Sequence, residues 1–131
     1  MNKLSSVFAC MGTEAAVDRI ETGWLFDFYG PLLTGRQGAL LALYCEEDLS
    51  FSEIAAREGI SRQAACDAVH RAARQLEAYE SRLGLLARYR RLTQGLGEGL
   101  EALRDAPGEQ AQRAREILTR LLSEEEGSDG L

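Results

Sequence analysis

Residues 49–72, LSFSEIAAREGISRQAACDAVHRA, constrain the fold of this 131-residue chain more than any other stretch. Ser50 and Glu53 have the spacing of a capping box, in which a hydroxyl and a carboxylate satisfy backbone groups at a helix start. Glycine often ends a helix in the left-handed conformation, so we expect Gly59 to end the first helix. Ser61 is a favourable cap for a second helix. Two helices joined by a short turn with a glycine are typical of the helix-turn-helix motif.

The second helix of this motif has an apolar face that repeats at three-and-four spacing, which predicts that this face is buried. We expect the helix to run as far as Leu83, because Gly84 follows and glycine often ends a helix. The repeating positions are Ala65, Val69, Ala72, Leu76, Tyr79 and Leu83.

The rest of the chain also favours helices. It has two prolines and no long alternation of apolar and polar residues, which is the pattern of strands. Thr34 and Gln37 have capping-box spacing, and aromatic residues lie four apart in the preceding GWLFDFYGPLL. We therefore predict an all-α fold in which a helix-turn-helix core has flanking helices.

Beyond Gly84 we expect two helices or one bent helix, because glycines at 95, 97 and 99 interrupt the apolar pattern. Pro107 suits the first turn of a last helix. The residues of that helix expected to point inward are Ala114, Ile117 and Leu121. The predicted divisions are a loose N-terminal segment (1–20), the helix-turn-helix domain (21–92), C-terminal helices (93–123) and an acidic tail (124–131).

An apolar stripe continues from the motif into the region after Gly84, and contiguous apolar patches are rare on monomers. Either the later helices fold back over this stripe, or a second chain covers it. We predict a symmetric homodimer, mediated by the long helix and its successor. The stripe consists of Leu76, Tyr79, Leu83, Leu86, Tyr89 and Leu92.

Charge is distributed unevenly along the chain. The whole has a net charge of −6, whereas residues 61–91 carry +4. A basic segment in an acidic protein permits contact with nucleic acid but weakens nonspecific binding. The predicted nucleic-acid-binding residues are Ser61, Arg62, Gln63, Asp67, His70, Arg71, Arg74, Arg88, Arg90 and Arg91.

The second helix is expected to contact both bases and phosphates, because its start enters the major groove in helix-turn-helix proteins. Arg62 and Gln63 lie in its first turn, where Arg can pair with guanine and Gln with adenine. Arg71 and Arg74 are better placed for phosphates. Pairing of these arginines with acidic residues of the same helix is the alternative.

A second basic cluster surrounds Tyr89 and consists of Arg88, Arg90 and Arg91. Arginines around an aromatic ring suit RNA, whose bases stack on such rings. Tyr89 also fits the apolar stripe, so burial of its ring is the alternative.

No catalytic or metal-binding pattern is evident. His70 is the single histidine and has no partner at a recognisable catalytic spacing. Cys10, Cys45 and Cys66 form no C-x-x-C pattern, and we interpret them as reduced, small apolar residues of a cytosolic protein. We expect no enzymatic activity, no cofactor, no metal and no membrane span.

The segment from Leu25 to Leu86 resembles the YlxM/p13-like helix-turn-helix family, UPF0122. The matching features are FDFY, LLT-x-RQ, Y-x-x-DLS-x-x-EIA, GISRQA and LE-x-YE, within residues 23–90. The resemblance implies a core like region 4 of sigma factors, or a winged-helix-like one. This chain departs from the family at three positions of the second helix. Cys66 stands where the family often has an aromatic residue, Ala68 where it has Asn, and His70 where it has Lys. Each difference removes a side chain that could read DNA.

The resemblance also implies a cytoplasmic accessory or regulatory protein of the bacterial signal recognition particle pathway. We expect the protein to bind nucleic acid, either the RNA of the particle or DNA. The protein component of the particle and its receptor GTPase are further possible partners under this resemblance. A sigma-like transcriptional regulator that binds DNA is the first alternative. The second is a protein-interaction module whose acidic faces bind a basic partner of the same pathway.

Overall fold

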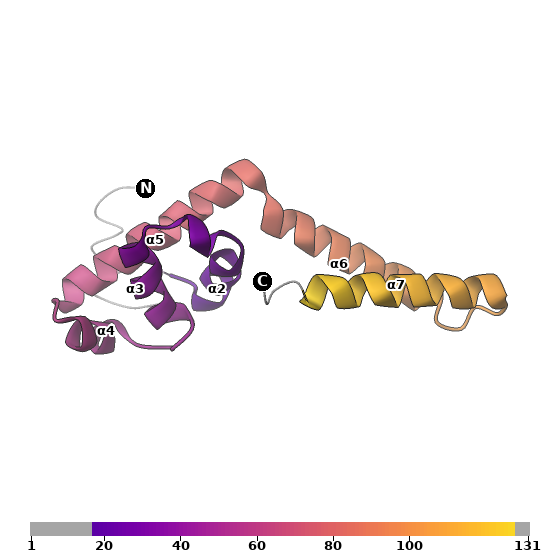
Figure 1. The fold of residues 1–131 in the computed structure, drawn as a ribbon, viewed down its shortest axis with the longest axis horizontal. Helices are drawn as coiled ribbons and strands as arrows, with labels where there is room; N and C mark the ends of the chain where they lie inside the picture. Colours follow the sequence, from indigo (N-terminus) through magenta and orange to yellow (C-terminus); the bar gives the residue numbers. More distant parts are fainter. Residues whose placement is uncertain (1–16, 128–131) are drawn as a thin grey trace. The chain divides into compact units, whose positions relative to one another are not determined.

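The computed structural model describes residues 17–127, which are mostly helical and contain no strand (Figure 1). The prediction of an all-α fold is confirmed, and this part of the chain has no wing of the winged-helix type. The helices are α2 (Arg19–Tyr29), α3 (Gly35–Cys45), α4 (Phe51–Glu58), α5 (Arg62–Leu83), α6 (Leu85–Ala102) and α7 (Glu109–Gly127), with a short 3-10 helix, η2 (Gly30–Leu32).

The chain divides into two compact units between Gly84 and Leu85, whereas we expected a division after residue 92. Unit 1 contains α2 to α5, and unit 2 contains α6 and α7. Most of the predicted loose segment, residues 1–16, lies outside the described residues. At its end Asp18 caps α2 by accepting from the backbone N–H groups of Ile20 and Glu21.

Both predicted capping boxes are present in unit 1. At α3 the backbone N–H of Gln37 donates to Thr34 Oγ1 at 3.2 Å, and Gln37 Oε1 accepts from the Thr34 N–H. At α4 the backbone N–H of Glu53 donates to Ser50 Oγ at 3.1 Å, and the Ser50 N–H donates to Glu53 Oε1 at 2.9 Å. These caps fix where the two helices begin.

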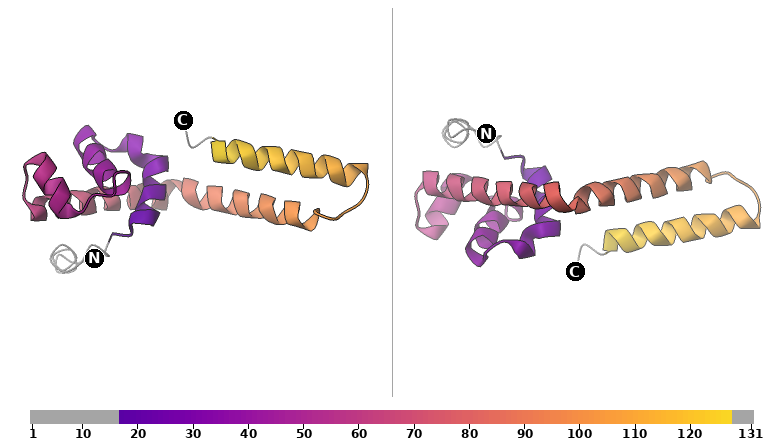
Figure 2. Two further views of the ribbon diagram at one scale, coloured as in Figure 1. Left: turned by 90° about the horizontal axis from the view of Figure 1, so that it is seen from below. Right: turned by 90° about the horizontal axis from the view of Figure 1, so that it is seen from above.

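The core of unit 1 forms where α2, α3 and α4 pack on α5 (Figure 2). Tyr44 of α3 and Phe51 of α4 are buried and stack with ring centroids 5.1 Å apart. Tyr29 at the end of α2 is fully buried, and its hydroxyl donates to Glu80 Oε1 of α5 at 2.5 Å. Since these contacts join residues far apart in the sequence, they hold α5 in a fixed position against the other three helices.

Arg19 closes the core beside Tyr44. Its guanidinium carbon lies 3.9 Å from the Tyr44 ring centroid, a cation–π distance. Its Nη2 donates to the carbonyl oxygen of Leu49 at 2.9 Å, and its Nη1 pairs with Asp48 Oδ1 at 2.9 Å. Arg19 therefore joins the start of α2 to the loop between α3 and α4.

Unit 2 is a hairpin of two antiparallel helices (Figure 2). The glycines at 95, 97 and 99 lie within α6, which is one helix from Leu85 to Ala102. Arg115 of α7 donates from Nη1 to the carbonyl oxygens of Leu103 and Ala106, at 2.6 and 2.9 Å. These two bonds hold the end of α6 and the connecting loop against α7.

Of the three residues of the last helix predicted to point inward, Ala114 is half-buried, whereas the prediction for Ile117 and Leu121 was wrong by one position. Ile117 and Leu121 are 39% and 37% exposed, whereas Leu118 and Leu122 are partly buried. The apolar pattern of α7 is broad enough for either register, and contact with α6 selects one of them. In the predicted acidic tail, residues 124–127 form the last turn of α7, and residues 128–131 lie outside the described part of the chain.

The predicted apolar stripe is covered only in part. Leu76 and Leu86 are buried, whereas Leu83 and Leu92 are 56% and 41% exposed. Packing within the chain thus covers some positions of the stripe and leaves others accessible.

Candidate nucleic-acid interface

The turn between α4 and α5 has the geometry expected from the sequence. Gly59 ends α4 in the left-handed conformation, with φ 68° and ψ 34°. The backbone N–H of Ile60 donates to the carbonyl oxygen of Ala55 at 3.1 Å, across the turn. Ser61 then caps α5, because its Oγ accepts from the N–H of Ala64 at 3.0 Å. Because the Ser61 hydroxyl oxygen accepts this capping bond, we assign this residue a role in starting the helix.

The outer surface of α5 combines basic, amide and small side chains. Arg62, Gln63, Arg71 and Arg74 are exposed, as predicted for residues that contact a ligand. Ala64 is exposed and Ala68 half-buried, so the surface between the arginines is shallow. Short side chains flanked by arginines allow a polyanion to approach the helix closely.

His70 does not belong to this surface, and its predicted position was wrong. The side chain is 7% exposed and its ring lies 6.3 Å from that of Phe51. Nε2 is buried and has no hydrogen-bond partner among the described residues. Burial lowers the pKa of His70 below its ordinary value, and nearby Arg74 lowers it further. A buried imidazole cannot reach a nucleic acid, so we exclude His70 from the interface.

A groove of about 220 Å³ lies between α3 and α5, next to the turn. Arg36 and Gln37 line it from the first turn of α3, and Arg71 lines it from α5. Its floor consists of Leu40, Ile60, Ala64 and Ala68. Sequence reasoning missed Arg36 and Gln37, since the capping box at Thr34 showed where α3 begins but not that its first turn lies beside α5.

Some polar groups of this surface already have partners in the chain. Gln63 Nε2 donates to Asp67 Oδ1 at 3.1 Å, and Arg36 Nη1 pairs with Glu58 Oε1 at 3.1 Å. The Arg62 guanidinium carbon lies 5.8 Å from the Phe51 ring centroid. These contacts are at the surface, where an ion pair is worth about 0–1 kcal/mol, so a phosphate can replace an acidic partner. The bond to Gln63 makes Asp67 a positioning residue here.

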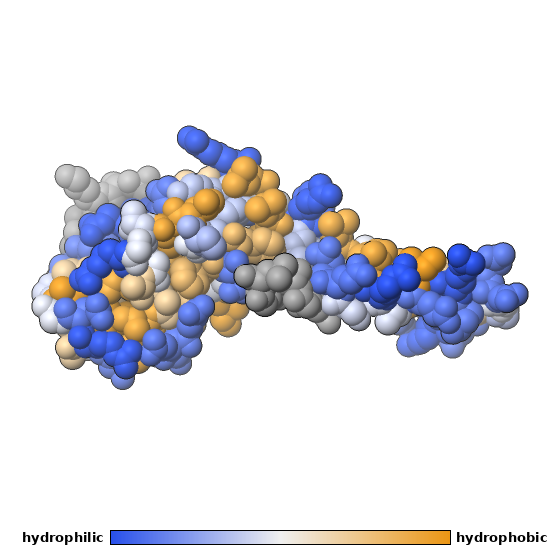
Figure 3. Space-filling model, viewed as in Figure 1, coloured by the Kyte–Doolittle hydropathy of each residue, from blue (hydrophilic) through white to orange (hydrophobic). Residues whose placement is uncertain are grey.

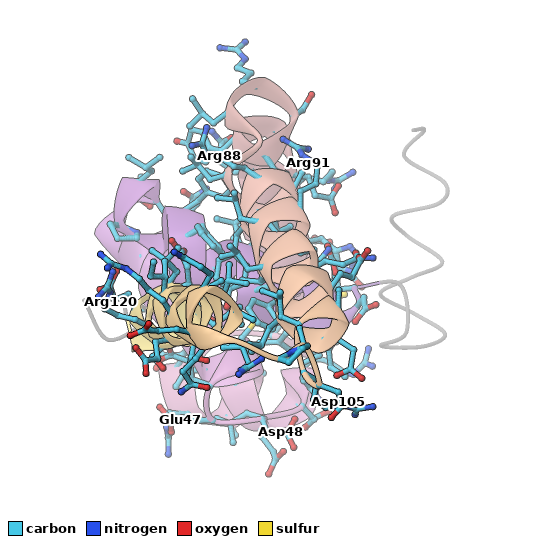
Figure 4. All side chains as sticks on the ribbon, turned by 90° about the vertical axis from the view of Figure 1, so that its right-hand side faces the viewer. Glu47, Asp48, Arg88, Arg91, Asp105 and Arg120 are labelled. Atoms are coloured by element: carbon cyan, nitrogen blue, oxygen red, sulfur yellow. The ribbon has the colours of Figure 1, made fainter. Side chains whose placement is uncertain are left out.

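The second predicted cluster belongs to unit 2. Arg88, Arg90 and Arg91 are exposed on α6, and Tyr89 between them is half-buried. Arg88 and Arg91 extend from different sides of that helix (Figure 4). We therefore treat this cluster as a separate basic surface of unit 2.

Residues 17–127 contain no group of three or more potential metal ligands, and none of the helices in this part of the chain is long and apolar enough to cross a membrane. Cys45 is free, and burial raises the pKa of its thiol to about 11. Cys66 is buried and disulfide-bonded, so the interpretation of all three cysteines as reduced was wrong. The spacing of cysteines along a sequence does not reveal which of them lie close enough to bond.

The turn, the caps and the arginine-bearing α5 define a helix-turn-helix protein. Residues 16–118 match the helix-turn-helix family described as YlxM / p13 like. The chain therefore belongs to this family, UPF0122, as the sequence motifs predicted.

Relatives with the same family name occur in several bacteria. A UPF0122 protein of Symbiobacterium thermophilum is 48% identical over 90 residues, which cover 69% of this chain and 84% of the relative. One from Desulforamulus reducens is 38% identical over 103 residues, 75% of this chain and 87% of the relative. One from Lacticaseibacillus casei is 52% identical over 65 residues, half of this chain and 58% of the relative. No solved structure gives a significant match.

Proposed function

We propose that this protein is a non-enzymatic accessory factor that binds nucleic acid through the exposed face of α5. The main support for this proposal is the groove beside the turn of the helix-turn-helix motif. Arg36 of α3 and Arg71 of α5 line this groove. Arginine is well suited to phosphate because its planar guanidinium donates two parallel hydrogen bonds. Membership in a helix-turn-helix family supports the same conclusion.

The proposed contacts divide into two kinds. Arg36, Arg71 and Arg74 bind phosphates and set the position of the protein on the polymer. Arg62 and Gln63 are exposed in the first turn of α5, from which base edges are read in other helix-turn-helix proteins. The small number of cations on an acidic chain predicts modest affinity that depends strongly on salt.

For the biological setting, we propose the cytoplasm and the signal recognition particle pathway. This part of the proposal comes from the family resemblance. The proposed ligand of the protein is the RNA of the particle. The exposed basic cluster Arg88, Arg90 and Arg91 supplies a second surface for RNA. The protein of the particle or its receptor GTPase are further proposed partners.

A sigma-like regulator that binds duplex DNA is the second candidate, favoured by the exposure of Arg62 and Gln63. The two candidates differ in which residues matter. Groove reading needs the first turn of α5, whereas RNA stacking around Tyr89 needs the cluster on α6. Should the protein bind no polymer even at low salt, its acidic surfaces would instead bind a basic protein of the pathway.

The test is a titration of labelled signal recognition particle RNA and of random-sequence duplex DNA with five proteins: wild type, Arg62→Ala, Gln63→Ala, Arg71→Ala and the double variant Arg90→Ala with Arg91→Ala. We expect Arg71→Ala to weaken binding of all sequences alike. For a DNA ligand, Arg62→Ala and Gln63→Ala change the sequence preference by about 1–3 kcal/mol at one position.

The same titration separates the candidates. If Arg62→Ala and Gln63→Ala leave duplex binding unchanged while the double variant on α6 abolishes RNA binding, the groove-reading function is wrong. Loss of DNA binding with intact RNA binding in Arg62→Ala would assign the two polymers to different surfaces. Circular dichroism of each variant checks that the helices remain folded.

We also propose that the protein is a homodimer. The large apolar residues that are exposed in the described part of unit 2 support this, because large apolar patches are rare on stable monomers; they are Leu85, Leu92, Ile117 and Leu121. Figure 3 shows apolar residues gathered among charged ones on the visible side of α6 and α7.

A further inference from the structure

The α6–α7 hairpin has one apolar flank in addition to its interior. In the interior, buried or half-buried residues repeat at three-and-four spacing along both helices. They include Leu96 and Leu100 on α6, Leu103 just beyond its end, and Ala111, Leu118 and Leu122 on α7. Because a helix turns about 100° per residue, the residues just before these positions form one flank and those just after form the other.

In an antiparallel pair, corresponding flanks of the two helices lie on the same side of the hairpin. Most residues just after these interior positions are polar, and Gly97 is the exception: Glu101 on α6, Arg104 just beyond it, and Gln112, Thr119 and Ser123 on α7. The residues just before them are apolar or small, except Gln110. We call the set Leu92, Gly95, Gly99, Ile117 and Leu121 the apolar flank.

All four exposed large apolar residues described in unit 2 lie just before an interior position: Leu85, Leu92, Ile117 and Leu121. Leu92, Ile117 and Leu121 are 41%, 39% and 37% exposed, and they come from both helices. The contrast with the polar flank shows that this exposure is confined to one side of the hairpin.

The glycines of the apolar flank have no steric explanation inside the chain. A Cβ added to Gly95 would meet nothing within 4 Å, and one added to Gly99 would meet only Leu118 Cδ1, at 3.6 Å, an ordinary contact. Each glycine nevertheless costs a helix about 1 kcal/mol relative to alanine. A glycine in a helix allows another element to approach the backbone closely.

We propose that the apolar flank binds a second copy of this chain, with α7 of each copy lying on α6 of the other. The proximity of Gly99 to Leu118, and the bond from Arg115 to Leu103, show which residues of α6 and α7 are level with each other. In a two-fold dimer whose axis runs along the hairpin, level residues of the two copies face each other. Ile117 and Leu121 of one copy then fill the space above Gly99 and Gly95 of the other.

The charges at the outer edge of the flank favour the same arrangement. Glu98 on α6 is level with Arg120 on α7, and Arg91 is close to the level of Glu124, and all four are exposed. Arg120 extends from α7 on the side away from α6 (Figure 4), so within one chain it does not face Glu98. In the dimer, Glu98 meets Arg120 of the second copy and Arg91 meets Glu124. The hairpin is therefore complementary to itself, as an isologous interface requires.

The inference rests on the proposed homodimer and is independent of the nucleic-acid ligand, so its test contains no nucleic acid. Light scattering after size-exclusion chromatography is measured on the full chain at tens of micromolar. The variants are Gly95→Leu and, as a matched control on the polar flank, Gly97→Leu. Neither added Cβ meets any atom within 4 Å in the chain, and both substitutions favour helix formation.

We expect the wild type and Gly97→Leu to be dimers and Gly95→Leu to be a monomer of unchanged helicity, because a leucine at 95 blocks the approach of α7 of the second copy. A monomeric wild type overturns both the homodimer and this interface. A dimeric Gly95→Leu overturns the interface and leaves the homodimer standing.

A charge exchange tests the orientation of the two copies. Glu98→Arg and Arg120→Glu should each shift the dimer toward monomer, by about 5-fold or more in the dissociation constant, since each creates two like-charge contacts per dimer. The double variant should restore the wild-type dissociation constant. Failure of the double variant to restore dimerisation would contradict the placement of α7 on α6.

Discussion

The imidazole of His70 lies 6.3 Å from the ring of Phe51, with 41° between the ring planes, underneath the exposed face of α5. Phe51 is the first residue of α4, and it also stacks on Tyr44 of α3. The single histidine of the chain therefore belongs to the core that supports the proposed interface. Its protonation should affect the stability of that core.

We predict that stability falls as the pH drops below about 6.5, the ordinary pKa of histidine. Burial and Arg74 lower the pKa of folded His70, so in this range the unfolded chain binds more protons than the folded one. Stability is therefore fully present above the unfolded pKa and is lost as the pH falls toward the folded pKa. Urea denaturation at several pH values between 7.5 and 5 measures the change.

The control for this prediction is His70→Leu, which keeps the site apolar and removes the titrating group. Carboxylates and other groups titrate in both proteins, so the difference between the two curves isolates His70. If the wild type and His70→Leu lose stability in parallel between pH 7 and 5, the imidazole is not the cause.

Arg19→Met should reduce the free energy of unfolding by about 2 kcal/mol. The substitution keeps an apolar stem but removes the bond to the Leu49 carbonyl oxygen and the cation–π contact with Tyr44. Arg57→Met is the matched control. Its pair with Glu47 is half exposed on both sides, and such pairs contribute about 0–1 kcal/mol. Equal effects of the two substitutions in urea denaturation would show that Arg19 does not hold α2 to the loop between α3 and α4.

Gly59→Ala should destabilise unit 1 by about 1–2 kcal/mol, because residue 59 has a φ of 68°, which costs a residue with a Cβ about that much. Gly38→Ala is the comparison within α3, where an added Cβ meets nothing within 4 Å. That change should instead stabilise by about 0.5–1 kcal/mol, the helix preference for alanine over glycine. Thermal denaturation of both variants tests the opposite signs, and a stabilising Gly59→Ala would contradict the turn geometry.

Local signals in the sequence predicted the helix boundaries well. Ser50, Gly59 and Ser61 act within one turn of the chain, so their hydrogen bonds and backbone conformation depend little on distant residues. The family motifs extend over the same region and were confirmed by the match to residues 16–118. These two kinds of signal were sufficient for the class of fold and the place of α5 in it.

Features that depend on packing between helices were not predictable in the same way. His70 was assigned to the surface because periodicity assumes one buried face, whereas three helices pack around α5 and bury a wider arc. Arg36 is 35 residues from Arg71 in the sequence, and only the packing of α3 on α5 brings both to one groove. The register of α7 was missed for the same reason, because the contact with α6 decides between two neighbouring apolar stripes.

The most direct measurement of the central claim is the salt dependence of nucleic-acid affinity in wild type and in Arg71→Gln with Arg74→Gln. The wild-type slope of the logarithm of the association constant against that of salt concentration should be about −2 to −5. Removing two phosphate contacts should make the slope less steep by about 2. Arg57→Gln with Arg113→Gln, which changes the net charge equally at exposed sites away from the groove, should keep the wild-type slope. Identical slopes for the two double variants would contradict binding through the exposed face of α5.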